Sequence, residues 1–274
     1  MITRFITALI GLPTLFIIIW LGNPLFSIVL VAIAAIGAWE FCQLAKSADK
    51  NPMTRFATIW SAIFVVANYF LSNNSSSLDH IIFLALNAII ATSGIIVSGL
   101  YIMIYHPQRT KLSNWITTIS ASIYTGGLIS YSVIILNLDH GREWIYVLIL
   151  TVFASDTLAF LTGKYFGKTP LAPGTSPGKT VEGAVGGIFG ALLTSLATIT
   201  IFGLGIHLFG VITLGILIGI TAQIGDLLES KIKRHFEVKD SGWIIPGHGG
   251  ILDRLDSIVF NLVLVYYFIL WATQ

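Results

Sequence analysis

Long apolar runs alternate with short polar breaks along almost the whole chain. A helix that crosses a bilayer needs about 20 mostly apolar residues. Nine runs approach that length, at residues 5–21, 25–43, 56–72, 80–104, 114–137, 144–163, 184–203, 206–228 and 257–273. Turn-forming residues such as Gly22-Asn23-Pro24 separate them. The pattern predicts an all-α, polytopic integral membrane protein with about nine transmembrane helices.

The composition supports this fold class. Of the 274 residues, 55% are hydrophobic and 10% are charged, whereas soluble domains carry about 25% charged residues. A soluble domain could not bury so much apolar surface. The net charge of +2 gives no electrostatic case for a nucleic-acid partner. The single cysteine, Cys42, excludes an intrachain disulfide, and its apolar surroundings predict a small buried side chain.

The Lys and Arg residues predict the orientation of the chain. If all nine runs cross the membrane, Arg142 alone of the 15 Lys and Arg residues lies on the opposite face from the others. The positive-inside rule makes the basic face cytoplasmic, which places the N-terminus inside. No small-x-small cleavage site follows the first run, so we expect a retained first helix. The compact length and the lack of a transit peptide favour a bacterial inner (cytoplasmic) membrane.

Two predicted cytoplasmic loops, 164–183 and 229–256, are long and polar. Such loops are more often functional than short ones. We therefore divide the chain into 1–140, with about five transmembrane helices, and 141–274, a catalytic region with about four. The first loop combines glycines, lysines and hydroxyl groups, which suit phosphate oxygens. It is not a P-loop, because Pro173 stands where the pattern needs glycine. A basic loop that only sets topology is the alternative.

The second loop is flanked by aspartates. Asp226 lies at the end of the eighth run, and the spacing of Glu229 and Lys233 predicts that this helix continues past the membrane. Asp253 and Asp256 are three residues apart, so they share one face at the start of the last helix. Carboxylates among cations suit Mg²⁺ that also binds substrate phosphates. The alternative is a set of salt bridges that pins the helix ends.

The stretch from Ser230 to Asp256 is similar to the defining motif of the phosphatidate cytidylyltransferase family. The matching residues are Ser230-x-Ile232-Lys233-Arg234, Lys239-Asp240-x-Gly242, Ile245-Pro246-x-His248-Gly249-Gly250-Ile251 and Asp253-Arg254-Leu255-Asp256. Ser155-Asp156 and Ser176-Pro177-x-Lys179-Thr180-x-Glu182-Gly183 also resemble this family. The resemblance is strong over about residues 155–256, and it rests on hydropathy alone over the first 140.

The resemblance implies a nucleotidyltransferase of phospholipid biosynthesis. CTP and phosphatidic acid would give CDP-diacylglycerol and pyrophosphate, with Mg²⁺ and possibly K⁺ as cofactors and a homodimer in the membrane. We expect Asp226 and Asp253 to bind the metal, with Asp256 as a third ligand or a support. The candidates for phosphate contact and catalysis are Lys233, Arg234, Arg254 and His248. The further candidates for nucleotide contact are Ser176, Lys179, Thr180, Ser230, Lys239 and Gly249.

Some polar groups fall outside these roles. Asp156 lies inside the sixth run, where it should face protein or water, and a role near the metal is open. Glu40 lies in an apolar run without an assigned role. The glycines from Gly183 to Gly190 suit close helix packing.

Other functions fit less of the sequence. A CTP-dependent polyprenol or phytol kinase would release CDP and a lipid monophosphate instead of pyrophosphate, and an ether-lipid CDP synthase would use a different lipid. A transporter would carry its charges near the membrane midplane, often in repeated broken helices, whereas these charges cluster at one face. A structural subunit would leave the clustered aspartates unexplained.

Overall fold

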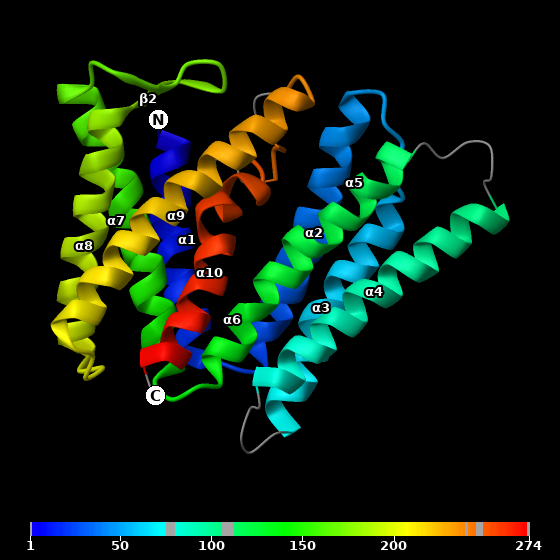
Figure 1. The fold of residues 1–274 in the computed structure, drawn as a ribbon, viewed down its shortest axis with the longest axis horizontal. Helices are drawn as coiled ribbons and strands as arrows, with labels where there is room; N and C mark the ends of the chain where they lie inside the picture. The colour runs from blue at the N-terminus through cyan, green and yellow to red at the C-terminus, as the bar shows by residue number, and fades with distance from the viewer. Residues whose placement is uncertain (1, 75–79, 106–111, 239–240, 245–248, 273–274) are drawn as a thin grey trace. The chain divides into compact units, whose positions relative to one another are not determined.

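The computed structural model describes residues 2–74, 80–105, 112–238, 241–244 and 249–272. These residues form nine continuous helical segments (Figure 1). Their bounds are α1 (Ile2–Leu21), α2 (Leu25–Ser47), α3 (Thr54–Asn74), α4 (His80–Tyr105), α5–η1–α6 (Leu112–Ser122, Ile123–Gly127 and Leu128–Leu136), α7 (Gly141–Phe166), α8 (Val181–Phe202), α9 (Leu208–His235) and α10 (Leu252–Ala272). Eight segments are long and apolar enough to cross a membrane, and α1 adds the shorter apolar stretch Leu9–Leu21. The predicted all-α polytopic membrane fold is confirmed.

Several helices extend beyond the apolar runs that predicted them. α9 continues past residue 228 to His235, as the spacing of its polar residues predicts, and α10 begins at Leu252 instead of residue 257. Hydropathy detects only the part of a helix that suits lipid, whereas polar residues are common in the first and last turns. Lys233, Arg234, Asp253 and Asp256 therefore lie on helices, not in a loop.

A short hairpin occupies part of the first polar loop. β1 (Pro170–Ala172) and β2 (Ser176–Thr180) pair antiparallel, with Pro170 opposite Thr180. At its base, the Glu182 carboxylate accepts the backbone N–H groups of Lys168 and Thr169 at 3.0 and 3.2 Å. The sequence predicted only an irregular loop here, because the Gly- and Pro-rich composition signals turns and does not reveal this carboxylate contact.

The chain divides into two units. The first contains residues 1–137 and 236–253, and the second contains residues 138–235 and 254–274. The predicted division at residue 140 lies near one of these boundaries. The segment 236–253, which the sequence assigned to the C-terminal region, packs with the first unit.

Buried hydroxyl and amide groups join the helices of the first unit. Ser61 on α3 donates to the carbonyl of Ala34 on α2 at 2.9 Å and pairs with Thr125 at 2.9 Å. Thr125 lies in the π-helical turn η1. Asn68 on α3 and Asn87 on α4 exchange two amide hydrogen bonds of 3.1 Å. Such small polar contacts are typical of helices packed in a membrane, where apolar burial alone drives little association.

Glycines bring the helices of the second unit close together. α7, α8 and α9 lie side by side within this unit (Figure 1). A Cβ atom on Gly187 of α8 would lie 3.0 Å from the Cβ of Ala159 on α7, and one on Gly190 would lie 2.9 Å from the carbonyl oxygen of Ala154. The predicted packing role of the glycine run is confirmed.

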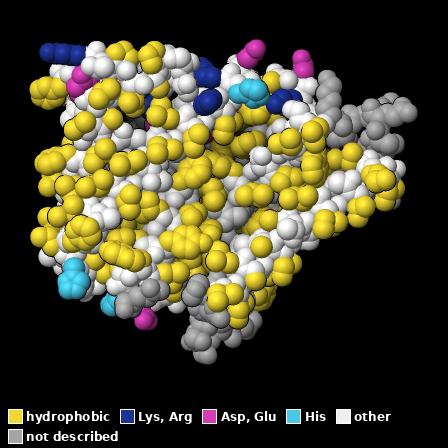
Figure 2. Space-filling model, in the orientation of Figure 1, with side chains coloured by type: hydrophobic (Ala, Val, Ile, Leu, Met, Phe, Trp, Pro, Cys, Tyr) yellow, Lys and Arg dark blue, Asp and Glu magenta, His cyan; other side chains and the backbone are white. Residues whose placement is uncertain are grey.

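Large apolar side chains cover much of the visible helical surface (Figure 2). Met103, Ile201 and Phe209 each expose more than 70% of their surface. In a soluble protein, apolar exposure on this scale would drive aggregation. In a bilayer it faces lipid tails, which agrees with the membrane assignment.

Candidate active site

Lys179 and Asp226 form an ion pair in the second unit. Lys179 Nζ lies 2.6 Å from Asp226 Oδ2, and both side chains are partly exposed. Lys179 reaches this position from β2, immediately before α8, and Asp226 lies on α9. The structure therefore brings together two candidates that are 47 residues apart in the sequence (226 − 179).

Further charges gather around this pair within the same unit. Asp156 on α7 interacts electrostatically with Asp226, with Asp256 on α10, and with Lys179 and Arg254. Gly225 allows the close approach of α9 to α10, because a Cβ there would collide with the backbone of Asp256. Three carboxylates and two cations from α7, β2, α9 and α10 thus form one cluster. A mixed cluster of this kind suits a polyphosphate bound together with a cation.

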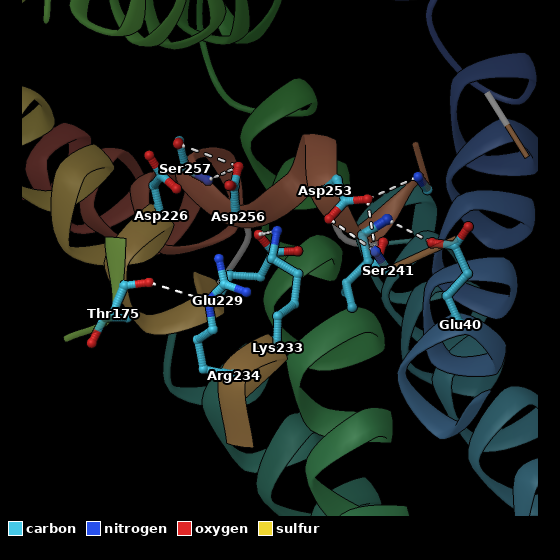
Figure 3. Close-up of polar contacts among 12 residues, drawn as sticks. Glu40, Thr175, Asp226, Glu229, Lys233, Arg234, Ser241, Asp253, Asp256 and Ser257 are labelled. Atoms are coloured by element: carbon cyan, nitrogen blue, oxygen red, sulfur yellow. Dashed lines mark hydrogen bonds and ion pairs between the residues drawn. The ribbon is translucent and has the colours of Figure 1, made fainter. Parts of the chain in front are cut away.

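Glu229 is a buried carboxylate that the sequence prediction did not include. Only 1% of its side chain is exposed, and its Oε2 lies 2.9 Å from Lys233 Nζ one helical turn later (Figure 3). Asp256 lies next to Glu229 in the same unit. The Glu-to-Lys spacing of four residues on a predicted helix was a usable signal for the first contact. Lys233, predicted to hold phosphate, thus also neutralises a buried acid.

Other predicted site residues lie on or next to the hairpin. Arg234 Nε on α9 donates to the carbonyl oxygen of Thr175 at 3.4 Å (Figure 3), and Thr175 lies between the two strands. Thr180 Oγ1 accepts the N–H of Gly183 at 3.1 Å and so caps α8. Ser176 on β2 and Ser230 on α9 are half-buried. Their predicted contacts with nucleotide stay predictions.

Asp253 closes the loop before α10 in the first unit. Its Oδ2 accepts the backbone N–H groups of Ser241 at 3.0 Å and Gly250 at 2.9 Å (Figure 3). Gly249 has φ = +87°, and a Cβ there would lie 2.7 Å from Asp253 Oδ2, so glycine is required. The role of Asp253 as a metal ligand stays a prediction. Lys239 and His248 lie outside the described residues.

The carboxylates of the second unit suit Mg²⁺ by donor type. Within the part of the chain that the structure describes, no group of three or more His, Cys, Asp or Glu side chains is placed to hold a metal by itself. Mg²⁺ usually takes one or two carboxylates, and substrate phosphates and water complete its octahedron. Asp226 and Asp256 fit such a shared site. The three-aspartate ligand set and the second cation, K⁺, stay predictions.

Comparison with known proteins places the chain in a family. Residues 2–272 match the cytidylyltransferase family. The chain is 41% identical over 148 residues to the phosphatidate cytidylyltransferase of Bacillus subtilis (strain 168), an alignment that covers 54% of this chain and 55% of that protein. It is 44% identical over 127 residues to the phosphatidate cytidylyltransferase of Staphylococcus aureus (strain COL), with 46% of this chain and 49% of that protein covered.

The matched part spans about half the length of those two relatives. A third relative is aligned almost throughout: the phosphatidate cytidylyltransferase of Synechocystis sp. is 30% identical over 293 residues, which cover 97% of this chain and 95% of that protein. Since the family match runs from the first helix to the last and includes every element that carries the charged cluster, the chain belongs to the cytidylyltransferase family.

Proposed function

We propose that this protein is a phosphatidate cytidylyltransferase that converts CTP and phosphatidic acid into CDP-diacylglycerol and pyrophosphate. The observation that carries the proposal is the cluster of Asp156, Asp226, Asp256, Lys179 and Arg254, which come from membrane helices and the adjoining hairpin. Three relatives of the chain bear the name of this activity.

In the proposed reaction, a phosphate oxygen of phosphatidic acid attacks the α-phosphorus of CTP. A new P–O bond forms while the bond from the α-phosphorus to the bridging oxygen breaks, and pyrophosphate leaves with that electron pair. The attacking oxygen is already anionic, so no strong general base is needed. The protein must instead hold two anions together and offset the charge on the leaving group.

The charged side chains fit these tasks. Lys179 and Arg254 would bind phosphate oxygens, and Lys179 would exchange Asp226 for phosphate as the nucleotide enters. Asp226 and Asp256 would hold the Mg²⁺. When bound, Mg²⁺ supplies charge neutralisation at the phosphates.

The location of the cluster suits the two substrates. The nucleotide is a soluble anion, and the lipid presents its phosphate at the surface of the bilayer. Polar groups at the ends of apolar helices meet both. We place this surface on the cytoplasmic side of a bacterial inner membrane, following the positive charges, and propose a homodimer in the membrane.

Turnover by the purified protein tests this function. The protein in detergent receives labelled CTP, phosphatidic acid and Mg²⁺, and both CDP-diacylglycerol and pyrophosphate are measured. We expect both products, loss of activity on chelation of Mg²⁺, and a fall of about 100-fold or more in kcat for Asp226→Asn. Asp139→Asn is the matched control, because Asp139 is an exposed aspartate at the other end of the helices.

Two results would overturn the proposal. One is phosphorylation of an isoprenoid alcohol with release of CDP and no reaction of phosphatidic acid. The other is full activity of Asp226→Asn, which would overturn the assignment of the active site to this cluster.

A further inference from the structure

We propose that Glu40 is a positioning residue for this reaction: it holds the backbone at the start of α10, the helix whose first turns carry Asp253, Arg254 and Asp256. The inference rests on the proposed function. Glu40 lies on α2, far in sequence from every motif residue, and its side chain is fully buried in an otherwise apolar span. A buried carboxylate is costly unless it is paired with strong donors, so its partners reveal what it does.

Its partners are two amide groups at the beginning of α10. The N–H of Ile251 donates to Glu40 Oε1 at 3.1 Å, and the N–H of Leu252 donates to Glu40 Oε2 at 2.8 Å (Figure 3). The first N–H groups of a helix have no partner within the helix, and they carry the positive end of its dipole. Glu40, which is far away in the sequence, therefore caps the first turn of α10, whose residues Leu252 and Asp253 belong to the same unit as α2.

The neighbouring glycines allow this contact. A Cβ atom on Gly242 would lie 2.6 Å from Glu40 Oε1, and one on Gly250 would lie 2.6 Å from Glu40 Oε2. Side chains at these two positions would push the loop away from the carboxylate. Glycine at these two motif positions therefore lets the loop backbone lie against the Glu40 carboxylate.

Glu40 and Asp253 hold the same short segment between them. The N–H of Gly250 donates to Asp253 Oδ2 at 2.9 Å, and the next two N–H groups along the chain donate to Glu40. Three consecutive amides are therefore fixed by two carboxylates. If Glu40 loses its charge, one of its two oxygens no longer accepts, so one amide loses its acceptor and the first turn of α10 is free to shift.

The test compares Glu40→Gln with the wild type. Glutamine keeps the size of the side chain but directs an NH₂ group at one of the two amide donors, so one hydrogen bond is lost and a clash of donors replaces it. We expect kcat to fall by about 10- to 100-fold, the range seen when a group supporting catalytic residues is lost, while KM for CTP changes by less than about threefold. Amide hydrogen exchange at residues 249–253 should become faster, with little change in α3 or α8.

Asn68→Ala controls for a general loss of stability. Asn68 is a fully buried polar side chain in the same unit that bonds Asn87 and not the α10 loop. At a matched loss of thermal stability, Asn68→Ala should retain kcat within about twofold.

Gly242→Ala gives a second, independent variant, useful if Glu40 variants fold poorly. It leaves the carboxylate in place but crowds it, so it should lower kcat as Glu40→Gln does. The double variant should be no worse than the more severe single one, because both changes disrupt the same contact.

The outcomes separate this inference from the proposed function. Equal kcat losses in Glu40→Gln and Asn68→Ala, or unchanged exchange at residues 249–253, would overturn the role of Glu40. If the wild type makes no CDP-diacylglycerol, the proposed function fails and the catalytic part of this inference fails with it. The exchange measurement would still decide whether Glu40 holds the start of α10.

Discussion

The ion pair between Lys233 and Glu229 contributes to the stability of the fold through single side chains. Glu229 is buried and Lys233 is 15% exposed, so both charges are largely withdrawn from water. Removing one partner of such a pair is more damaging than replacing both, because the remaining charge loses its main compensation. The two residues therefore have a structural role as well as any role in binding phosphate.

Lys233→Met should lower stability and activity together. The expected cost is up to about 3–5 kcal/mol, because the cation facing the buried Glu229 is lost. The double variant Lys233→Met/Glu229→Gln should regain much of the thermal stability in detergent but not the turnover. Lys231→Met, at an exposed lysine of the same helix, should change neither. A double variant less stable than Lys233→Met would contradict this account of the pair.

At the scale of elements, the contact between α7 and α8 supports the charged cluster. α7 carries Asp156, and α8 follows directly from the hairpin that carries Lys179. Their backbones approach closely only because glycines line the face of α8. Any side chain that separates the two helices should move the charges that they position.

Gly190→Ala should destabilise the second unit. The added Cβ would lie 2.8 Å from Leu158 Cδ1 and 2.9 Å from the carbonyl of Ala154, and crowding of this kind costs about 1–3 kcal/mol. The measurement is thermal unfolding in detergent. Gly174→Ala is the control, because nothing lies within 4 Å of a Cβ at that exposed turn. Equal unfolding temperatures for the two variants would show that close α7–α8 packing is not required.

At the scale of the whole molecule, the distribution of charge predicts which side of the membrane each polar segment faces. The hairpin and Asp139 are separated by one predicted span, so they should lie on opposite sides. The single native cysteine, Cys42, is buried, which makes the chain suitable for labelling experiments after Cys42→Ala.

Single cysteines introduced as Gly174→Cys and Asp139→Cys test this topology. A membrane-impermeant maleimide should label the first only in inside-out vesicles and the second only in intact spheroplasts. Both positions are exposed, so accessibility within the protein does not limit the reaction. Labelling of both from the same side would contradict the predicted number of spans or their orientation.

Local physical chemistry explains what could be predicted from sequence. Burial in lipid requires about 20 apolar residues per span, a property of each segment by itself, so the membrane fold and its helices were predictable. The spacing of Asp253 and Asp256, and the continuation of α9 through Lys233, follow from the helical repeat alone. The hairpin was missed, because its order depends on Glu182 binding two backbone amides beyond the strands.

The sequence by itself determined the class of the protein, its spans and most of the charged residues that gather in the cluster. Only the tertiary structure decided which of these charges meet, since Lys179 and Asp226 belong to elements that no local rule pairs. The tertiary structure also determined the hydrogen-bond partners of Glu40, which in the sequence is a single acidic residue within an apolar run. Its partners are backbone amides more than 200 residues away. Every residue except proline has a backbone amide, so the residue types in the sequence do not predict this contact.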